Sequence, residues 1–395
     1  MYMKQLKYIL HVWYGELMHV LHNSGLIIFC LLVPLAYPLL YSFVYTNETV
    51  REVPIAVVDE CHSTMSREFA RKVDATPDVE VLFHTDLAQA QELMRREQVY
   101  AIMRIPSSFD HDLYRGDQTR VALYSDMRSM LYYKAALLAA SNVSLEMNAD
   151  IKVTRYLPGT TDRQEEVIKA PVTNSYVALF NPQSGVASFL LPAVLMLMLQ
   201  QLLFLSIGTS MGLYRERNGG IGIPADNPYY RNAFCVVIGK VTFYLPLFLL
   251  FAVYMYAAVT PLFSFLQLGD YVTFLRFVVP YLLACILMGI AMSGFIYRSE
   301  DSMLLYIFMS VPLLFLSGMS WPVASEPMFW RCISWIFPST FGMHGYVRIM
   351  GTGAELSQVS TEYHALWILC AIYFVLAWMV YRHEFHRLSK KEGIA

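Results

Sequence analysis

A long stretch without charge constrains this chain more than any other feature. From Ala170 to Tyr214 there is no Asp, Glu, Lys or Arg, and then Arg215, Glu216 and Arg217 follow one another. A charged side chain at the centre of a bilayer-spanning helix costs about 2.5–3.5 kcal/mol, whereas a water-soluble domain has no reason to avoid charge for so long. Only 15% of all residues are charged, against about a quarter in soluble domains. The sequence therefore predicts a membrane protein.

Six segments are long and apolar enough to cross a bilayer, which takes about 20 residues of helix. They are residues 26–45, 186–214, 233–263, 274–297, 303–319 and 365–381. Lipid offers no partner to backbone N–H and C=O groups, and these runs lack the alternation of barrel strands, so we expect helices. The predicted fold class is an α-helical polytopic membrane protein with six transmembrane helices. An N-terminal interfacial helix precedes the first, and a small α/β extracytoplasmic domain lies between helices 1 and 2.

The distribution of Lys and Arg in the short connections predicts the orientation. Ten of them lie in one set of alternate connections and three in the other, which places both termini in the cytoplasm. The chain then divides into 1–45 (interfacial helix and first span), 46–182 (extracytoplasmic domain), 183–382 (spans 2–6) and 383–395 (cytoplasmic tail). The predicted location is the cell (inner) membrane.

Residues 4–24 have the pattern of an amphipathic helix. Apolar residues recur at spacings of three and four; they are Leu6, Leu10, Trp13, Leu17 and Leu21. Lys4, Lys7, His11 and His22 lie elsewhere on the helix, so we expect it to lie in the membrane interface. The histidines at 11, 19 and 22 are interpreted as polar residues at headgroup level rather than as metal ligands.

The insertion has a pattern of alternating strands and helices, which favours a small α/β domain. Strands are predicted at 53–57, 79–83, 99–105 and 121–124, and helices at 63–73, 86–96, 107–114 and 130–156. Its acids and histidines are interpreted as solvated loop residues, since no catalytic or metal motif joins them. They are Asp59, His62, His84, Asp110, His111 and Asp112. Neither a catalytic residue nor a metal site is predicted. The net charge of −2 gives no reason to expect nucleic acid as a partner.

Several short motifs occur in an order that resembles the membrane subunit of an ABC type-2 exporter. FNPQ (180–183) leads into the second span, and YRERNGG (214–220) closes it. LSGMSWPV (316–323) follows the fifth span, and WIFPSTFGMHGYVRI (335–349) comes next. The match covers about residues 1–45 and 180–390. It departs from the family where Asn218-Gly219-Gly220 replaces the more frequent Gly-Thr or Gly-Ser followed by an acid.

The resemblance implies a role for the element after the second span. In the family this element contacts the ATPase, which would assign ATPase coupling to Arg215, Glu216, Arg217, Gly219 and Gly220. No G-x-x-x-x-G-K-[ST] motif occurs in the sequence, so this chain is expected to bind no cofactor itself. ATP and Mg²⁺ are expected on a partner subunit. Further expected partners are a second permease copy or paralogue, the lipid membrane and a periplasmic adaptor protein.

The segment 320–345 is too aromatic for a plain loop and is interrupted by prolines. It fits re-entrant helices, which protein or water must surround, and equally an aromatic belt at the interface. As an outer gate, the candidate residues are Ser317, Gly318, Trp321, Pro322 and Pro338.

Two other functional classes stay open. A secondary transporter needs ionisable residues inside the spans, and Lys240 and Arg276 are the candidates, although both lie near span ends, where Lys240 is expected to snorkel. A membrane-anchored receptor or assembly scaffold would work through residues 46–182.

Overall fold

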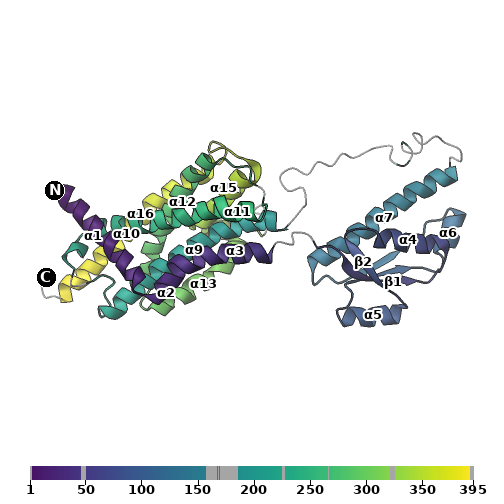
Figure 1. The fold of residues 1–395 in the computed structure, drawn as a ribbon, viewed down its shortest axis with the longest axis horizontal. Coiled ribbons are helices and arrows are strands. Elements are labelled where there is room, and N and C mark those ends of the chain that lie inside the picture. The colour runs from purple at the N-terminus through teal and green to yellow at the C-terminus, as the bar shows by residue number, and fades with distance from the viewer. Residues whose placement is uncertain are drawn as a thin grey trace. The chain divides into compact units, whose positions relative to one another are not determined.

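The computed structural model describes residues 2–45, 50–156, 167, 169, 186–224, 227–265, 267–320 and 325–391. The chain forms two compact units, one of Met1–Glu48 with Ala178–Ala395 and one of Thr49–Val177. We call the first the membrane unit and the second the inserted unit, and describe each by itself (Figure 1).

Among the described residues, six helices of the membrane unit are long and apolar enough to span a bilayer. Span 1 consists of α2 (Ser24–Ile27), η1 (Ile28–Leu32) and α3 (Val33–Val44); span 2 is α9 (Val186–Arg217). Span 3 consists of α10 (Ala233–Tyr254), η3 (Met255–Val259) and α11 (Thr260–Leu262). Span 4 is α12 (Tyr271–Met292) with η4 (Ser293–Phe295), span 5 is α13 (Ser299–Leu316) and span 6 is α16 (Ser360–Lys391). The predicted helical membrane fold is thereby confirmed.

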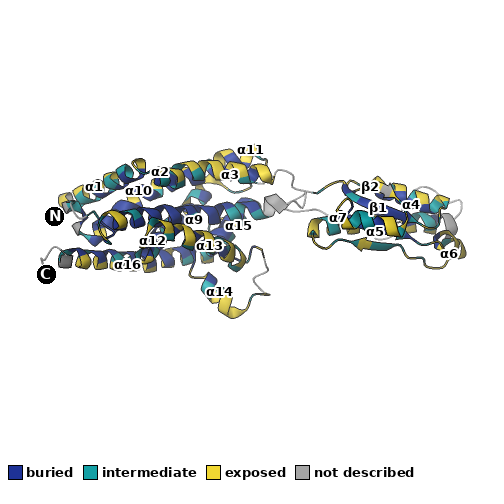
Figure 2. Cartoon of the chain, turned by 90° about the horizontal axis from the view of Figure 1, so that it is seen from below, coloured by how far each residue is buried: buried dark blue, intermediate teal, exposed yellow. Residues whose placement is uncertain are grey.

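The centre of the membrane unit is built by α9 and α12. Both are buried along most of their length, and α9 stands out in dark blue in Figure 2. Phe204 and Tyr306 pack with ring centroids 5.0 Å apart and join α9 to α13. Gly345 lets the backbone of α15 (Pro338–Thr352) approach α12, because a Cβ there would lie 2.1 Å from the Phe277 ring. Close helix contacts of this kind hold bundles together in lipid.

The first helix, α1 (Tyr2–Leu21), begins close to where α16 ends, so both termini lie at one end of the membrane unit (Figure 1). We call this the basal end. Leu6 and Leu10 on α1 are exposed, whereas Val12 and Glu16 are fully buried against the bundle. Leu6, Leu10 and Leu21 of the predicted apolar stripe therefore face outward, whereas Trp13 and Leu17 pack partly buried against the bundle. The interpretation of His19 as a headgroup-level residue is wrong, since its side chain is buried.

Between spans 5 and 6 the described chain forms two helices. The longer, α15, is buried among α9, α12 and α16, and the shorter, α14 (Met328–Ser334), exposes Phe329 and Trp330. Within the segment 320–345, exposed aromatic residues on α14 are thus followed by the beginning of the buried helix α15. Trp321 and Pro322 lie outside the described residues.

The inserted unit contains a four-stranded sheet of order β2-β1-β3-β4. Its strands are β1 (Val53–Asp59), β2 (Val79–His84), β3 (Ala101–Ile105) and β4 (Ala122–Ser125). Its helices are α4 (Thr64–Asp74), α5 (Leu87–Arg95), α6 (Phe109–Arg115) and α7 (Met130–Tyr156). Strand β1 pairs in parallel with β2 and β3, and β4 is antiparallel to β3. Every predicted strand and helix of this unit is present, with bounds within a few residues.

Two hydrophobic clusters cover the two faces of this sheet. On one face Ile55 and Val57 pack against Phe69 of α4 and Ala136 of α7. On the other face Ala56 and Val58 pack with Ala90 of α5. Alternate residues of β1 thus face opposite layers, as the period of a strand requires. The consequence is that α4 and α5 leave the sheet on opposite sides.

Candidate functional site at the basal end of the second span

The three consecutive charges that end α9 each contact a different element. Arg215 reaches α16, Glu216 reaches the start of α13, and Arg217 reaches Asn23, which precedes α2. Side chains at successive helix positions point about 100° apart, so three consecutive residues at a helix end can contact three different neighbouring elements. We call Arg215–Gly220 the α9 terminus.

Arg215 lies in the interior. Its Nη2 is 2.7 Å from Oε1 of Glu384, and both side chains are 2% exposed. Its Nη1 donates to the backbone carbonyls of Ser293 and Ile296 at the end of span 4. A planar guanidinium with several donors suits such a buried, multiply bonded position. Arg215 thus ties α9 to spans 4 and 6 and is covered by this chain's own residues.

Glu216 and Arg217 lie at the surface. Oε1 of Glu216 accepts from the backbone N–H of Ser299 at 2.8 Å and from its hydroxyl at 2.9 Å. This carboxylate therefore satisfies a free donor in the first turn of α13, where negative charge is stabilising. Nη2 of Arg217 donates to Oδ1 of Asn23 at 2.8 Å. Both side chains are exposed and accessible to a partner.

The turn after α9 is held by its own hydrogen bonds. Gly219 and Gly220 have φ of 62° and 91°, left-handed values that favour glycine and often end a helix. The N–H of Gly220 donates to the carbonyl of Arg215 at 2.7 Å. The N–H of Gly222 donates to Oε2 of Glu384 at 2.8 Å, so one carboxylate binds both Arg215 and the turn. The predicted coupling residues are thus brought into one compact structure; their contact with an ATPase stays a prediction.

A second buried ion pair lies nearby and was not predicted. Nζ of Lys240 on α10 is 2.8 Å from Oε1 of Glu16 on α1, and these side chains are 1% and 0% exposed. The hydroxyl of Ser210 donates to Oε2 of Glu16 at 3.3 Å. The expectation that Lys240 snorkels to the interface is therefore wrong, because α1 covers it and supplies its counter-charge.

His19 belongs to the same cluster. Its ring stacks on Tyr214 with centroids 4.0 Å apart. Burial lowers the pKa of His19 below its usual 6.5, while Glu16 opposes this and Lys240 adds to it. The sequence signal for the cluster was Glu16 itself, an acid inside an otherwise apolar and basic amphipathic helix.

Three of the five gate candidates, Ser317, Gly318 and Pro338, lie among the described residues. Pro338 occupies the first turn of α15, and Ser317 ends α13, with its carbonyl 2.6 Å from Nε2 of His344. Gly318 has a φ of 74°. The sequence analysis missed Gln200, in the middle of α9, whose Oε1 accepts from the N–H of Ser339 at 2.7 Å and whose Nε2 donates to the Ser339 hydroxyl at 3.1 Å. A neutral amide within a charge-free span was the available signal.

A cavity of about 420 Å³ lies between spans 1, 2 and 5. Its walls are mainly apolar and aromatic, with Gln201 and Ser310 as polar groups; among the lining residues are Phe29, Tyr37, Met198 and Tyr306. Pockets of this kind suit hydrophobic or amphipathic ligands. Among the described residues, no group of three or more His, Cys, Asp or Glu converges as a metal site.

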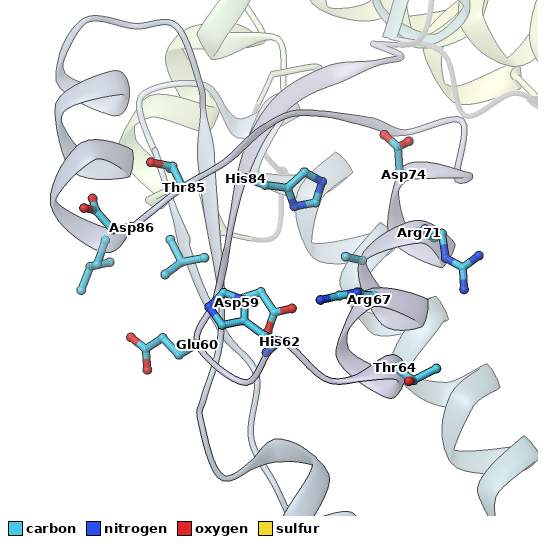
Figure 3. Close-up of a pocket in the computed structure, with 13 residues that line it drawn as sticks. Asp59, Glu60, His62, Thr64, Arg67, Arg71, Asp74, His84, Thr85 and Asp86 are labelled. Atoms are coloured by element: carbon cyan, nitrogen blue, oxygen red, sulfur yellow. Dashed lines mark hydrogen bonds between the residues drawn. The ribbon is translucent and has the colours of Figure 1, made fainter.

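Three of the acids and histidines noted in the inserted unit line one pocket. They are Asp59, His62 and His84 (Figure 3). Asp110, His111 and Asp112 instead lie on α6. The interpretation of all six as solvated loop residues is therefore wrong: the first three share a pocket and the other three lie on a helix.

Comparison with known proteins gives two results. The model of a family described as "ABC-2 family transporter protein" matches residues 24–379. The chain is also 20% identical over 350 residues to the linearmycin resistance permease protein LnrN of Bacillus subtilis (strain 168), a match that covers 83% of this chain and 88% of that protein.

Proposed function

The chain belongs to the ABC-2 family of transporter proteins, and from this premise we propose that it is the membrane-spanning permease subunit of an ATP-driven exporter. A separate ATPase subunit would bind and hydrolyse ATP with Mg²⁺, because the sequence has no phosphate-binding loop of its own. The permease would move a hydrophobic or amphipathic substrate out of the cytoplasm or the inner leaflet. It would itself catalyse no reaction.

The observation that supports this proposal best is the α9 terminus. Its exposed side chains, Glu216 and Arg217, are also bonded to Ser299 and Asn23, at the beginnings of spans 5 and 1. An ATPase that displaces this terminus would therefore act on spans 1, 2 and 5 together. Buried Arg215 would transfer the same displacement to α16 through Glu384. Rigid elements with such contacts can convert a local shift into a change of gate state.

The same three spans, 1, 2 and 5, would also form the substrate path. Their cavity is apolar and aromatic, and displacement of spans 1, 2 and 5 would change its shape. The relative from Bacillus subtilis is named for resistance to linearmycin, a role that export of a toxic compound would serve. We therefore propose that this cavity receives the substrate.

A second permease copy or paralogue would complete the path. Spans 1 and 5 are poorly covered by the rest of the protein. In their most apolar 18 residues only 22% and 17% of residues are buried, whereas the figure is 78% in spans 2 and 4. The two least covered of these spans thus form a wall of the cavity, and a partner permease would close it. The opposite end, with α14 and α15, would be the outer gate, and Gln200 would hold the first turn of α15.

The orientation proposed from Lys and Arg places the basal end in the cytoplasm. This puts the α9 terminus on the side where ATP is available. The inserted unit would then be extracytoplasmic, where a periplasmic adaptor is a further proposed partner in a cell with two membranes.

Affinity purification of the tagged chain from its native membrane tests the proposal. We expect an ATPase subunit in near-stoichiometric amount, and less of it with the double variant Glu216→Gln/Arg217→Gln. The matched control is Arg348→Gln/Glu355→Gln, which changes the same residue types, with the arginine on α15 and the glutamate in the connection that follows it. A native complex that contains no ATPase would contradict the proposal.

The buried Glu16–Lys240 pair favours one alternative, a secondary transporter, because ion-coupled transporters carry ionisable groups inside their membrane part. The survival of cells exposed to toxic amphipathic compounds would distinguish an ATP-driven exporter from a secondary transporter. An ATP-driven exporter should keep working when the proton gradient is collapsed and should stop when ATP is depleted. The reverse result would favour the secondary transporter.

A further inference from the structure

The pocket of the inserted unit lies at a special position in its sheet. Asp59 ends β1 and His84 ends β2, and these strands are parallel neighbours. The chain continues from β1 into α4 on one face and from β2 into α5 on the other. Neighbouring strands that continue to opposite faces leave a crevice at their carboxyl ends, and open α/β sheets bind ligands there. A cavity of about 760 Å³ occupies this place (Figure 3).

The acidic side chains of the crevice are engaged within the unit. Asp59 accepts from the N–H groups of Cys61 and His62 and from the hydroxyl of Ser66. The other three acids have partners of their own. Asp74 accepts from the N–H of Val81, and Asp86 caps α5 by accepting from the N–H of Gln89. Glu60 accepts two hydrogen bonds from the Arg104 guanidinium. Each of these carboxylates thus accepts at least one hydrogen bond within the unit, and Glu60 has Arg104 as its counter-charge.

The basic side chains of the crevice are free. Arg67 and Arg71 lie one turn apart on α4, and His62 and His84 lie at the ends of β1 and β2. None of the four side chains has an ion pair or hydrogen bond to another described residue, and all four residues are exposed. In Figure 3, Arg67 extends from α4 towards the turn that carries Asp59 and His62. Unpaired donors at a crevice are available to a ligand.

The start of α4 adds to this charge. Helix α4 begins at Thr64, which lines the cavity, so the positive end of its dipole faces the same space. No group of three or more His, Cys, Asp or Glu converges as a metal site among the described residues. An arginine fork matches the oxygens of carboxylates and phosphates in geometry as well as in charge.

We infer that this crevice binds a small molecule through a phosphate or carboxylate group, with Arg67, His62 and His84 as its main contacts and Arg71 at the rim. The inference does not depend on the transport function proposed above. It assigns a ligand site to the inserted unit, for which that function names no ligand. The bound group belongs either to a soluble metabolite or to a lipid headgroup, since both present the same oxygens.

Isothermal titration of the full-length protein in detergent micelles, with inorganic phosphate and citrate as probes, tests the inference. We expect saturable binding of at least one probe, and binding at least tenfold weaker in Arg67→Ala and in His84→Ala. The matched control is Arg95→Ala on α5, an exposed arginine outside the crevice, which should bind as the wild type does. Elution volume and far-ultraviolet circular dichroism should show that all three variants are folded.

A competition experiment distinguishes the two sources. If dihexanoyl phosphatidic acid displaces the probe at tenfold lower concentration than glycerol 3-phosphate, the site is for a lipid headgroup; equal displacement indicates a soluble ligand. Either result supports an oxyanion site. Absence of saturable binding for both probes would overturn the inference, and so would equal affinities of Arg67→Ala, His84→Ala and the Arg95→Ala control.

Discussion

Arg215 and Glu384 form a buried ion pair, with 2.7 Å between Nη2 and Oε1, that joins the end of the second span to the sixth. The same carboxylate accepts the N–H of Gly222, so helix, turn and final span share one acceptor. Charges removed from water are stable only when their partners are in place. The α9 terminus is therefore a preformed structure, in which Arg215 sets the position and Glu216 and Arg217 are presented outward.

Loss of Arg215 should destabilise the membrane unit. Arg215→Met leaves Glu384 buried without its main partner, which costs roughly 3–5 kcal/mol when a buried pair is broken from one side. The thermal unfolding temperature in detergent micelles should fall clearly. The control Arg382→Met removes an exposed arginine from α16 and should change little. Equal unfolding temperatures for both variants would show that the pair is not structural.

The Glu16–Lys240 pair allows a double-variant test. Lys240→Met should lower the unfolding temperature strongly, because Glu16 stays buried beside a neutral side chain. The double variant Glu16→Gln/Lys240→Met removes both charges and should recover at least half of the loss. Lys4→Met, on the exposed part of α1, serves as the control. A double variant no more stable than Lys240→Met would contradict direct coupling.

The packing of α15 on α12 should depend on Gly345. An alanine Cβ there would lie 2.1 Å from the ring of Phe277, which is fully buried. Overpacking of this kind typically costs about 1–3 kcal/mol. Gly351 of the same helix has nothing within 4 Å of such a Cβ, so Gly351→Ala should be neutral or stabilising. Unfolding temperatures of the two variants in the opposite order would refute this packing.

The stability of the α1 contact should depend on pH through His19. Burial disfavours the protonated ring, so the pKa of His19 is lowered in the folded protein, and the unfolded chain binds more protons as the pH falls below about 6.5. The contribution is therefore complete above that pH and is lost as the pH falls through the folded pKa. Between pH 8 and pH 5 the unfolding temperature should fall less in His19→Gln than in the wild type. The control His22→Gln, an exposed position, should behave as the wild type, and identical slopes for all three proteins would contradict the account.

Most of the fold could be predicted from local sequence patterns. The helix predicted at 63–73 begins after Ser63, whose hydroxyl oxygen caps it by accepting from the N–H of Ser66 at 3.0 Å. The long helix predicted at 130–156 is present with the same bounds. Such features depend on neighbouring residues and on apolar periodicity, which a single sequence displays directly.

The site required information that periodicity does not contain. The pattern of α1 defined two faces but not which one packs on the bundle, since leucine is stable against lipid as well as against protein. Glu16 and Lys240 are distant in the sequence, so their pairing follows only from the packing of α1 on α10. Likewise, Asp59 and His84 line the same pocket because β1 and β2 are parallel neighbours, a strand order that the sequence did not reveal.

The central claim is that the α9 terminus contacts an ATPase, and photo-crosslinking in intact cells tests it most directly. A benzoylphenylalanine in place of exposed Arg217 should give a crosslinked product that contains a protein with a phosphate-binding loop. The same group in place of Tyr114, exposed on α6 of the inserted unit, should not. Crosslinks to an ATPase from position 114, or from neither position, would contradict the account.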